Sequence, residues 1–108
     1  MTVKTITATE LKTQLEQGAS LFLLDVREEF EYKYAHIADS VLIPLNKLPE
    51  RVGELDANRA IVTICHHGMR SKRAANFLDS AGFTNITNLE GGIDAWSLYC
   101  DNSVPRYS

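Results

Sequence analysis

The sequence has few cysteines, no excess of positive charge and no long hydrophobic run. Its two cysteines, Cys65 and Cys100, are too few for the disulfide framework of a small secreted domain. The net charge of -3 provides no basic field that would attract nucleic acid or an anionic membrane. No apolar run approaches the ~20 residues of a membrane-spanning helix, and the N-terminus lacks the apolar segment of a secretory signal. We therefore expect a reduced, cytoplasmic protein without nucleic-acid or membrane partners.

The rest of the composition is that of an ordinary folded chain. Hydrophobic residues make up 44% and charged residues 23% of the chain, which are proportions typical of globular domains. A chain of 108 residues is the size of one domain and can form a core without disulfide bonds. We expect a single domain spanning residues 1–108.

Short β-rich segments alternate with helical ones along the chain. Residues 60–64 are uncharged and mostly β-branched, which indicates a central strand, and residues 21–24 form the apolar run typical of a strand buried on both faces. The other predicted elements are strands at residues 3–6, 41–43 and 85–87, a helix from the capping box at residues 7–10 to Gly18, and helices at residues 27–34, 45–55, 71–81 and 91–98. This alternation predicts a small α/β domain with a mainly parallel sheet flanked by helices.

A polar loop, Cys65–Arg70, follows the predicted central strand and precedes a helix expected to start at Ser71. In parallel sheets, ligand sites lie at the carboxyl ends of strands. Gly68 permits the positive φ of a tight curl, and such a curl turns backbone N–H groups inward to form an anion-binding concavity. The helix N-terminus and the Arg70 guanidinium add positive charge. These groups favour the thiolate of Cys65 and could also hold the outer sulfur of a persulfide.

Two histidines in the same loop, His66 and His67, raise the alternative of a metal site. Three consecutive residues on a tight turn seldom reach one tetrahedral ion, and no second pair of ligands completes the set. We therefore expect no metal and no organic cofactor. The histidines are interpreted as residues of the pocket rim, one of which could donate a hydrogen bond to an incoming anion.

Further charged and polar residues follow the strand at residues 21–24. Asp25 and Arg27 are either active-site charges or a buried structural pair, and we favour the structural pair. His36 is predicted to be structural, with its ring satisfied by nearby backbone groups.

Several motifs, in order along nearly the whole chain, resemble those of the rhodanese family. The loop Cys65–Ser71 is similar to the family's active-site pattern Cys-x-x-Gly-x-Arg-Ser. The family's other signatures are resembled by Asp25–Glu28 with Glu31-Tyr32 and His36-Ile37, by Ile43–Leu45, and by Leu89 with Gly91-Gly92 and Trp96. The family usually has glycine at the position of Ala35 and again near Asp39. If the backbone needs a positive φ at Ala35, that residue is strained or the segment follows another path.

The resemblance implies a rhodanese-like fold and a sulfurtransferase. Cys65 would take sulfane sulfur from a small-molecule donor such as thiosulfate and pass it from a persulfide to a thiol or protein acceptor. The site residues that it implies are His66, His67, Gly68, Met69, Arg70 and Ser71 for the substrate, with Asp25, Arg27 and His36 in support. A persulfide carrier or docking module for one partner protein would have the same sequence, so that alternative stays open.

A related class, the phosphatases and arsenate reductases, also places a thiolate in an anion-binding loop. Their loop is one residue longer between cysteine and arginine, so that it encloses a tetrahedral oxyanion. Only four residues separate Cys65 from Arg70 here. The smaller ring suits a single sulfur atom better, and we regard this alternative as the less favoured one.

Overall fold

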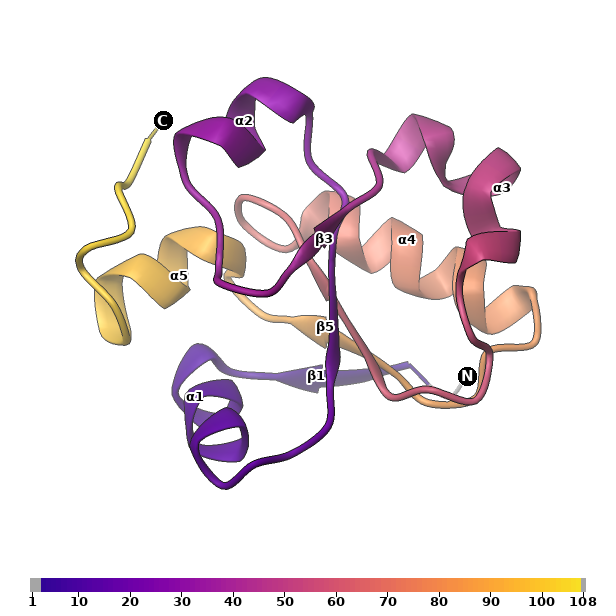
Figure 1. Ribbon diagram of the computed structural model, residues 1–108, viewed down its shortest axis with the longest axis horizontal. Helices are drawn as coiled ribbons and strands as arrows, with labels where there is room; N and C mark the ends of the chain where they lie inside the picture. The colour runs from indigo at the N-terminus through magenta and orange to yellow at the C-terminus, as the bar shows by residue number, and fades with distance from the viewer. Residues whose placement is uncertain (1–2, 108) are drawn as a thin grey trace.

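The computed structural model describes residues 3–107 and shows a five-stranded sheet with helices on both faces (Figure 1). The strands are β1 (Lys4–Ile6), β2 (Phe22–Asp25), β3 (Val41–Leu42), β4 (Ile61–Ile64) and β5 (Ile86–Leu89). Their order across the sheet is β1-β5-β4-β2-β3, and every neighbouring pair is parallel. The predicted parallel α/β sheet is therefore confirmed, and the strand predicted at residues 60–64 lies at its centre.

Four helices connect these strands: α1 (Ala8–Glu16), α2 (Glu29–Tyr34), α3 (Leu48–Arg51) and α4 (Met69–Ser80). A fifth helix, α5 (Gly92–Tyr99), follows β5. The capping box predicted for α1 is confirmed, since the Thr7 side chain accepts from the Glu10 amide while the Glu10 carboxylate accepts from the Thr7 amide. The single helix predicted at residues 45–55 is wrong. That segment is α3 flanked by two short 3-10 turns, because Pro49 and Gly53 both disfavour a continuous helix.

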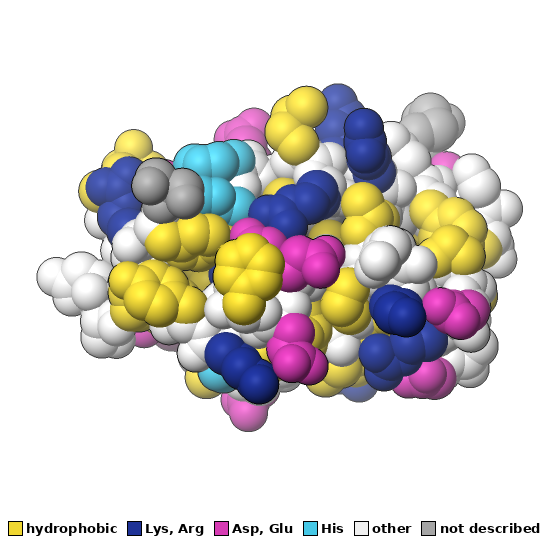
Figure 2. Space-filling model, turned by 90° about the horizontal axis from the view of Figure 1, so that it is seen from above, with side chains coloured by type: hydrophobic (Ala, Val, Ile, Leu, Met, Phe, Trp, Pro, Cys, Tyr) yellow, Lys and Arg dark blue, Asp and Glu magenta, His cyan; other side chains and the backbone are white. Residues whose placement is uncertain are grey.

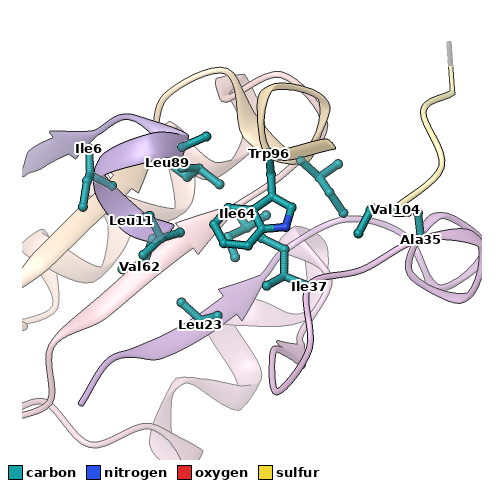
Figure 3. Packing of buried hydrophobic residues seen from close by; sticks show 12 residues of the cluster. Ile6, Leu11, Leu23, Ala35, Ile37, Val62, Ile64, Leu89, Trp96 and Val104 are labelled. Carbon is teal, nitrogen blue, oxygen red and sulfur yellow. The ribbon is translucent and has the colours of Figure 1, made fainter. Parts of the chain in front are cut away.

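The sheet separates two hydrophobic cores, because successive side chains of a strand point to opposite faces. Val62 and Ile64 belong to the core under α1 and α5, whereas Ile61 and Cys65 belong to the core under α3 and α4. Figure 3 shows the first core, in which Trp96 of α5 lies among aliphatic side chains from the strands. Cys65 therefore faces α4.

The condition for strain at Ala35 is not met in the segment after α2. Ala35 has a φ of -158° and is buried, so it is ordinary extended backbone. The left-handed conformation falls instead on Asp39, with a φ of 68°. Asp tolerates this region better than most residues with a Cβ, because its short polar side chain can hydrogen-bond locally.

Within residues 3–107, no helix has the length and apolar character needed to cross a membrane.

Candidate active site

Cys65 lies directly after β4, at the carboxyl end of the central strand, and only 1% of its surface is exposed. Its Sγ accepts a hydrogen bond from the Gly68 amide at 3.0 Å and lies 3.2 Å from the hydroxyl of buried Ser71. Gly68 has a φ of 103°, so the chain turns into α4 directly after this amide. The inward-facing amide predicted for this loop is therefore present at Gly68, and Ser71 supplies a second donor from α4.

The helix after the loop begins earlier than predicted. It starts at Met69 with Gly68 as its N-cap, not at Ser71. The prediction was wrong because no Ser, Thr, Asp or Asn precedes Met69, and the left-handed Gly68 ends the loop without such a signal. Arg70 is consequently the second residue of α4 instead of a loop residue, and Met69 is 75% exposed at the surface.

The first turn of α5 is hydrogen-bonded to the loop that contains Cys65. The amides of Ile93 and Asp94 donate to the carbonyls of Cys65 and His66, at 2.8 and 3.1 Å. Because a trans peptide places N–H opposite C=O, the amides that follow these carbonyls point away from α5. A Cβ on Gly92 would lie 2.4 Å from both carbonyl oxygens, so only glycine permits this close approach. Gly91 and Gly92 both have positive φ, and they turn the chain from β5 into α5.

Asn88 of β5 joins the loop to the neighbouring strand β4. Its side-chain amide donates to the Gly68 carbonyl at 3.2 Å, and its Oδ1 lies 3.3 Å from the Thr63 hydroxyl of β4. Sequence reasoning missed this residue because it predicted that the last strand would end at residue 87. The signal was a polar side chain at a buried position of a strand, which in a folded protein needs a hydrogen-bond partner.

Arg70 is held in a bidentate ion pair with Glu31 of α2, with N–O distances of 2.7 and 2.8 Å. The Glu31 carboxylate also accepts from the Glu28 amide and the Tyr107 hydroxyl, at 3.0 and 2.8 Å. Chiefly because of Arg70, the pKa of Glu31 falls to about 2, and the same pairing raises the pKa of Arg70. The pair uses one N–H of each terminal nitrogen, so the guanidinium keeps further donors for an anion.

The interpretation of Asp25 and Arg27 as a buried structural pair is confirmed. Both side chains are fully buried, and two hydrogen bonds of 2.6 and 2.8 Å join them. Arg27 also donates to the Ala35 carbonyl at 2.6 Å and to the Tyr107 hydroxyl at 3.0 Å. Through Arg27, the end of β2 is tied both to the end of α2 and to the C-terminal segment.

His36 is exposed, and its ring contacts Tyr32. Its Nδ1 lies 2.9 Å from the Tyr32 carbonyl, and the two rings stack with centroids 4.2 Å apart. The prediction that nearby backbone satisfies the ring is confirmed.

His66 and His67 lie side by side, with ring centroids 3.9 Å apart. His66 is half-buried: its Nε2 lies 2.8 Å from the Tyr107 carbonyl, and its ring stacks on the Tyr107 ring at 3.9 Å. Burial, and secondly the charge of His67, lower the pKa of His66. His67 is exposed, with Nδ1 4.0 Å from a carboxylate oxygen of Asp94. Figure 2 shows the molecule from above, where histidine side chains lie beside basic and acidic ones.

Comparison with known proteins places the chain in a family. Residues 7–99 match the model of the rhodanese-like domain. The chain belongs to the rhodanese family. The chain is 38% identical over 96 residues to "Putative sulfurtransferase YtwF" of Bacillus subtilis, and the match covers 89% of this chain and 92% of that protein. It is 33% identical over 90 residues to thiosulfate sulfurtransferase GlpE of Pseudomonas savastanoi, over 82% and 83% of the two chains.

Solved structures agree with this placement. The crystal structure of a rhodanese-like domain protein from Staphylococcus aureus superposes with a TM-score of 0.84 at 30% identity, covering 97% of this chain and 99% of that chain. The resemblance found in the motifs and the predicted rhodanese-like fold are both confirmed. The family is one of sulfurtransferases.

The sequence indicated Glu31 only as part of a family signature, and it indicated no role for Tyr107. Glu31 carried the better signal, since it occupies a family motif whose neighbours are functional candidates. Tyr107 carried none, because it lies beyond the matched residues 7–99 and follows an irregular segment.

Proposed function

We propose that this rhodanese domain is a cytoplasmic sulfurtransferase that carries sulfane sulfur as a persulfide on Cys65. The proposal rests on the position of the Cys65 sulfur. Cys65 Sγ lies at the end of the central strand with an amide and a hydroxyl within 3.0 and 3.2 Å. Donors at this distance stabilise a thiolate, and they can equally stabilise the charge of a persulfide. Both cysteines are free thiols, as sulfur transfer in a reducing compartment requires.

The donor in the proposal is thiosulfate, which is also named in the relative from Pseudomonas savastanoi. The Cys65 thiolate attacks the outer sulfur, a new S–S bond forms, and the S–S bond of thiosulfate breaks so that sulfite leaves with the bonding electron pair. Arg70 and the loop amides bind the donor's anionic oxygens and stabilise the departing sulfite.

The acceptor completes a two-step cycle. A thiolate, from a small molecule or a protein, attacks the outer sulfur of the Cys65 persulfide. The sulfur passes to the acceptor, and the Cys65 thiolate is regenerated. The persulfide formed in the first step is consumed in the second, and the cycle returns Cys65 to its thiolate, so the proposal needs no further oxidant, reductant or cofactor.

The test combines intact mass spectrometry with a thiosulfate:cyanide assay. After thiosulfate treatment, we expect one added sulfur atom on the wild type and none on Cys65→Ser, together with loss of turnover in that variant. Cys100→Ser is the matched control, since Cys100 lies at the end of α5 and should leave loading and turnover intact. Turnover by Cys65→Ser would contradict the proposal. Loading without turnover on small acceptors would favour the carrier alternative.

A further inference from the structure

The C-terminal segment beyond α5 returns to the active site. It rises from the end of α5 toward α2 (Figure 1). Val104 is buried in the core under α1 and α5, and its carbonyl accepts from the Ser97 hydroxyl. Arg106 pairs with Asp94 at 2.9 Å. These contacts bring Tyr107 over the loop that contains Cys65, although Tyr107 lies outside the residues 7–99 that match the family.

The Tyr107 hydroxyl has a fixed hydrogen-bond direction. Arg27 has donors only, so it must donate to the Tyr107 oxygen at 3.0 Å. The hydroxyl hydrogen is then available for the Glu31 carboxylate at 2.8 Å. Burial, foremost, raises the pKa of Tyr107 to about 12, so the hydroxyl stays a donor at neutral pH.

The main chain and ring of Tyr107 act on His66. A carbonyl oxygen can only accept, so neutral His66 carries its proton on Nε2, 2.8 Å from the Tyr107 carbonyl. The stacked Tyr107 ring, inclined by only 8°, covers the imidazole. One residue thus contacts both the histidine of the loop and the carboxylate that holds Arg70.

We propose that Tyr107 is a positioning residue of the active site, acting on Arg70 through Glu31 and on His66 through its carbonyl and ring. Through its hydroxyl, it fixes the carboxylate to which the Arg70 guanidinium is bound. Through its carbonyl and ring, it fixes the orientation of His66 at the rim. The kinetic part of this inference rests on the proposed transfer of sulfur from thiosulfate.

The first experiment compares Tyr107→Phe with Tyr99→Phe, an exposed tyrosine on α5, in the thiosulfate:cyanide assay. Loss of one hydrogen bond to a charged group should raise the KM for thiosulfate about fivefold and change kcat less than about twofold. Tyr99→Phe should leave both constants unchanged. An unchanged KM in Tyr107→Phe would overturn the proposal. A fall in kcat that is fully explained by a smaller fraction of Cys65 loaded with sulfur would also overturn it.

A double-mutant cycle tests whether Tyr107 acts through Glu31. Adding Tyr107→Phe to Glu31→Gln should change the KM less than about twofold, because the carboxylate that Tyr107 holds is already gone. A fivefold effect that persists in that background would show that the hydroxyl acts elsewhere and would overturn the proposed route to Arg70.

A pH titration by NMR reads the effect on His66 without any turnover. The groups facing His66 are Tyr107, His67, Asp94 and Glu31. Because burial lowers the pKa of His66, Tyr107→Ala should raise it, whereas Tyr107→Phe, which keeps the ring, should not. With three histidines in the chain, the signals are readily assigned. If the wild type fails to use thiosulfate, the proposed function fails, and this titration still decides the inference: an unchanged pKa in Tyr107→Ala would overturn it.

Discussion

Arg70 forms an ion pair with Glu31 in the site, so Glu31 largely compensates the charge of the guanidinium that is proposed to bind the donor anion. Two oxygens of Glu31 hold the two terminal nitrogens of Arg70, which fixes the plane of the guanidinium and directs its remaining N–H groups. At the scale of single residues, the proposed binding of the donor therefore depends on both partners.

Arg70→Ala should raise the KM for thiosulfate by about tenfold or more, since it removes charged donors and leaves the Glu31 carboxylate without its partner. The double variant Arg70→Ala/Glu31→Gln should recover part of that loss, because the repelling charge is gone. Steady-state kinetics on the wild type and the variants would check both points. Equal KM values for wild type and Arg70→Ala would rule out a role for Arg70 in donor binding.

The paired carboxylate also makes stability depend on pH. The pKa of Glu31 is about 2 in the folded protein against an ordinary value of 4.5, so the native state favours the ionised form. The stabilisation is present above pH 4.5 and is lost as the pH falls toward 2. Urea unfolding should show that wild type exceeds Glu31→Gln in free energy of unfolding at neutral pH and that the difference shrinks across this window. A difference that is constant with pH would contradict the ion-pair contribution.

At the scale of elements, the site depends on the close approach of α5 to the loop after β4. The α5 amides reach the carbonyls of Cys65 and His66 only because Gly92 has no side chain. The same contact directs the following loop amides away from α5. The helix therefore helps to set the conformation of the loop without supplying a side chain to Cys65.

Gly92→Ala should destabilise the protein by on the order of 3 kcal/mol or more and abolish persulfide loading, because its Cβ would lie 2.4 Å from two carbonyl oxygens. The matched control is Gly82→Ala, which has a φ of 96° and nothing within 4 Å of the added Cβ. Gly82→Ala introduces backbone strain without a close contact, so it should lower the free energy of unfolding by about 1–2 kcal/mol while persulfide loading persists. Chemical denaturation and mass spectrometry measure the two effects. Similar losses in both variants would show that φ, not the close approach, is what matters.

At the scale of the whole molecule, Arg27 joins three segments far apart in the sequence. It binds Asp25 of β2, the Ala35 carbonyl after α2 and the Tyr107 hydroxyl of the C-terminal segment. The groups involved are buried or half-buried, so each hydrogen bond replaces one that water made in the unfolded chain. Removing the centre of this network leaves several polar groups unpaired at once.

Arg27→Met should lower the free energy of unfolding by about 3–5 kcal/mol, since it leaves the buried Asp25 carboxylate without a partner. The exposed pair Arg51–Glu54 provides the control, and Arg51→Met should cost less than about 1 kcal/mol. Urea denaturation of both variants would test this. A loss below about 1 kcal/mol for Arg27→Met would mean that the network contributes little to folding.

The sequence by itself determined the features that depend on local patterns. The β-branched run at residues 60–64 specifies the central strand because such side chains suit a sheet buried on both faces. The spacing of Cys65, Gly68 and Arg70 specifies a tight loop at the end of that strand. The boundaries of the elements did not follow from local patterns to the same extent. The helix α4 starts at Met69 because a left-handed glycine caps it, and no capping side chain in the sequence indicates that start.

Tertiary structure alone decided which distant residues meet at the loop. Arg70 and Glu31 lie 39 residues apart, and Tyr107 and Glu31 lie 76 apart. Helical and strand periodicity carries no information on such pairs, because they meet only after the parallel crossovers have ordered the sheet as β1-β5-β4-β2-β3. The sequence therefore determined the proposed nucleophile and its loop, whereas packing determined the carboxylate, the tyrosine and the helix end that hold the loop in place.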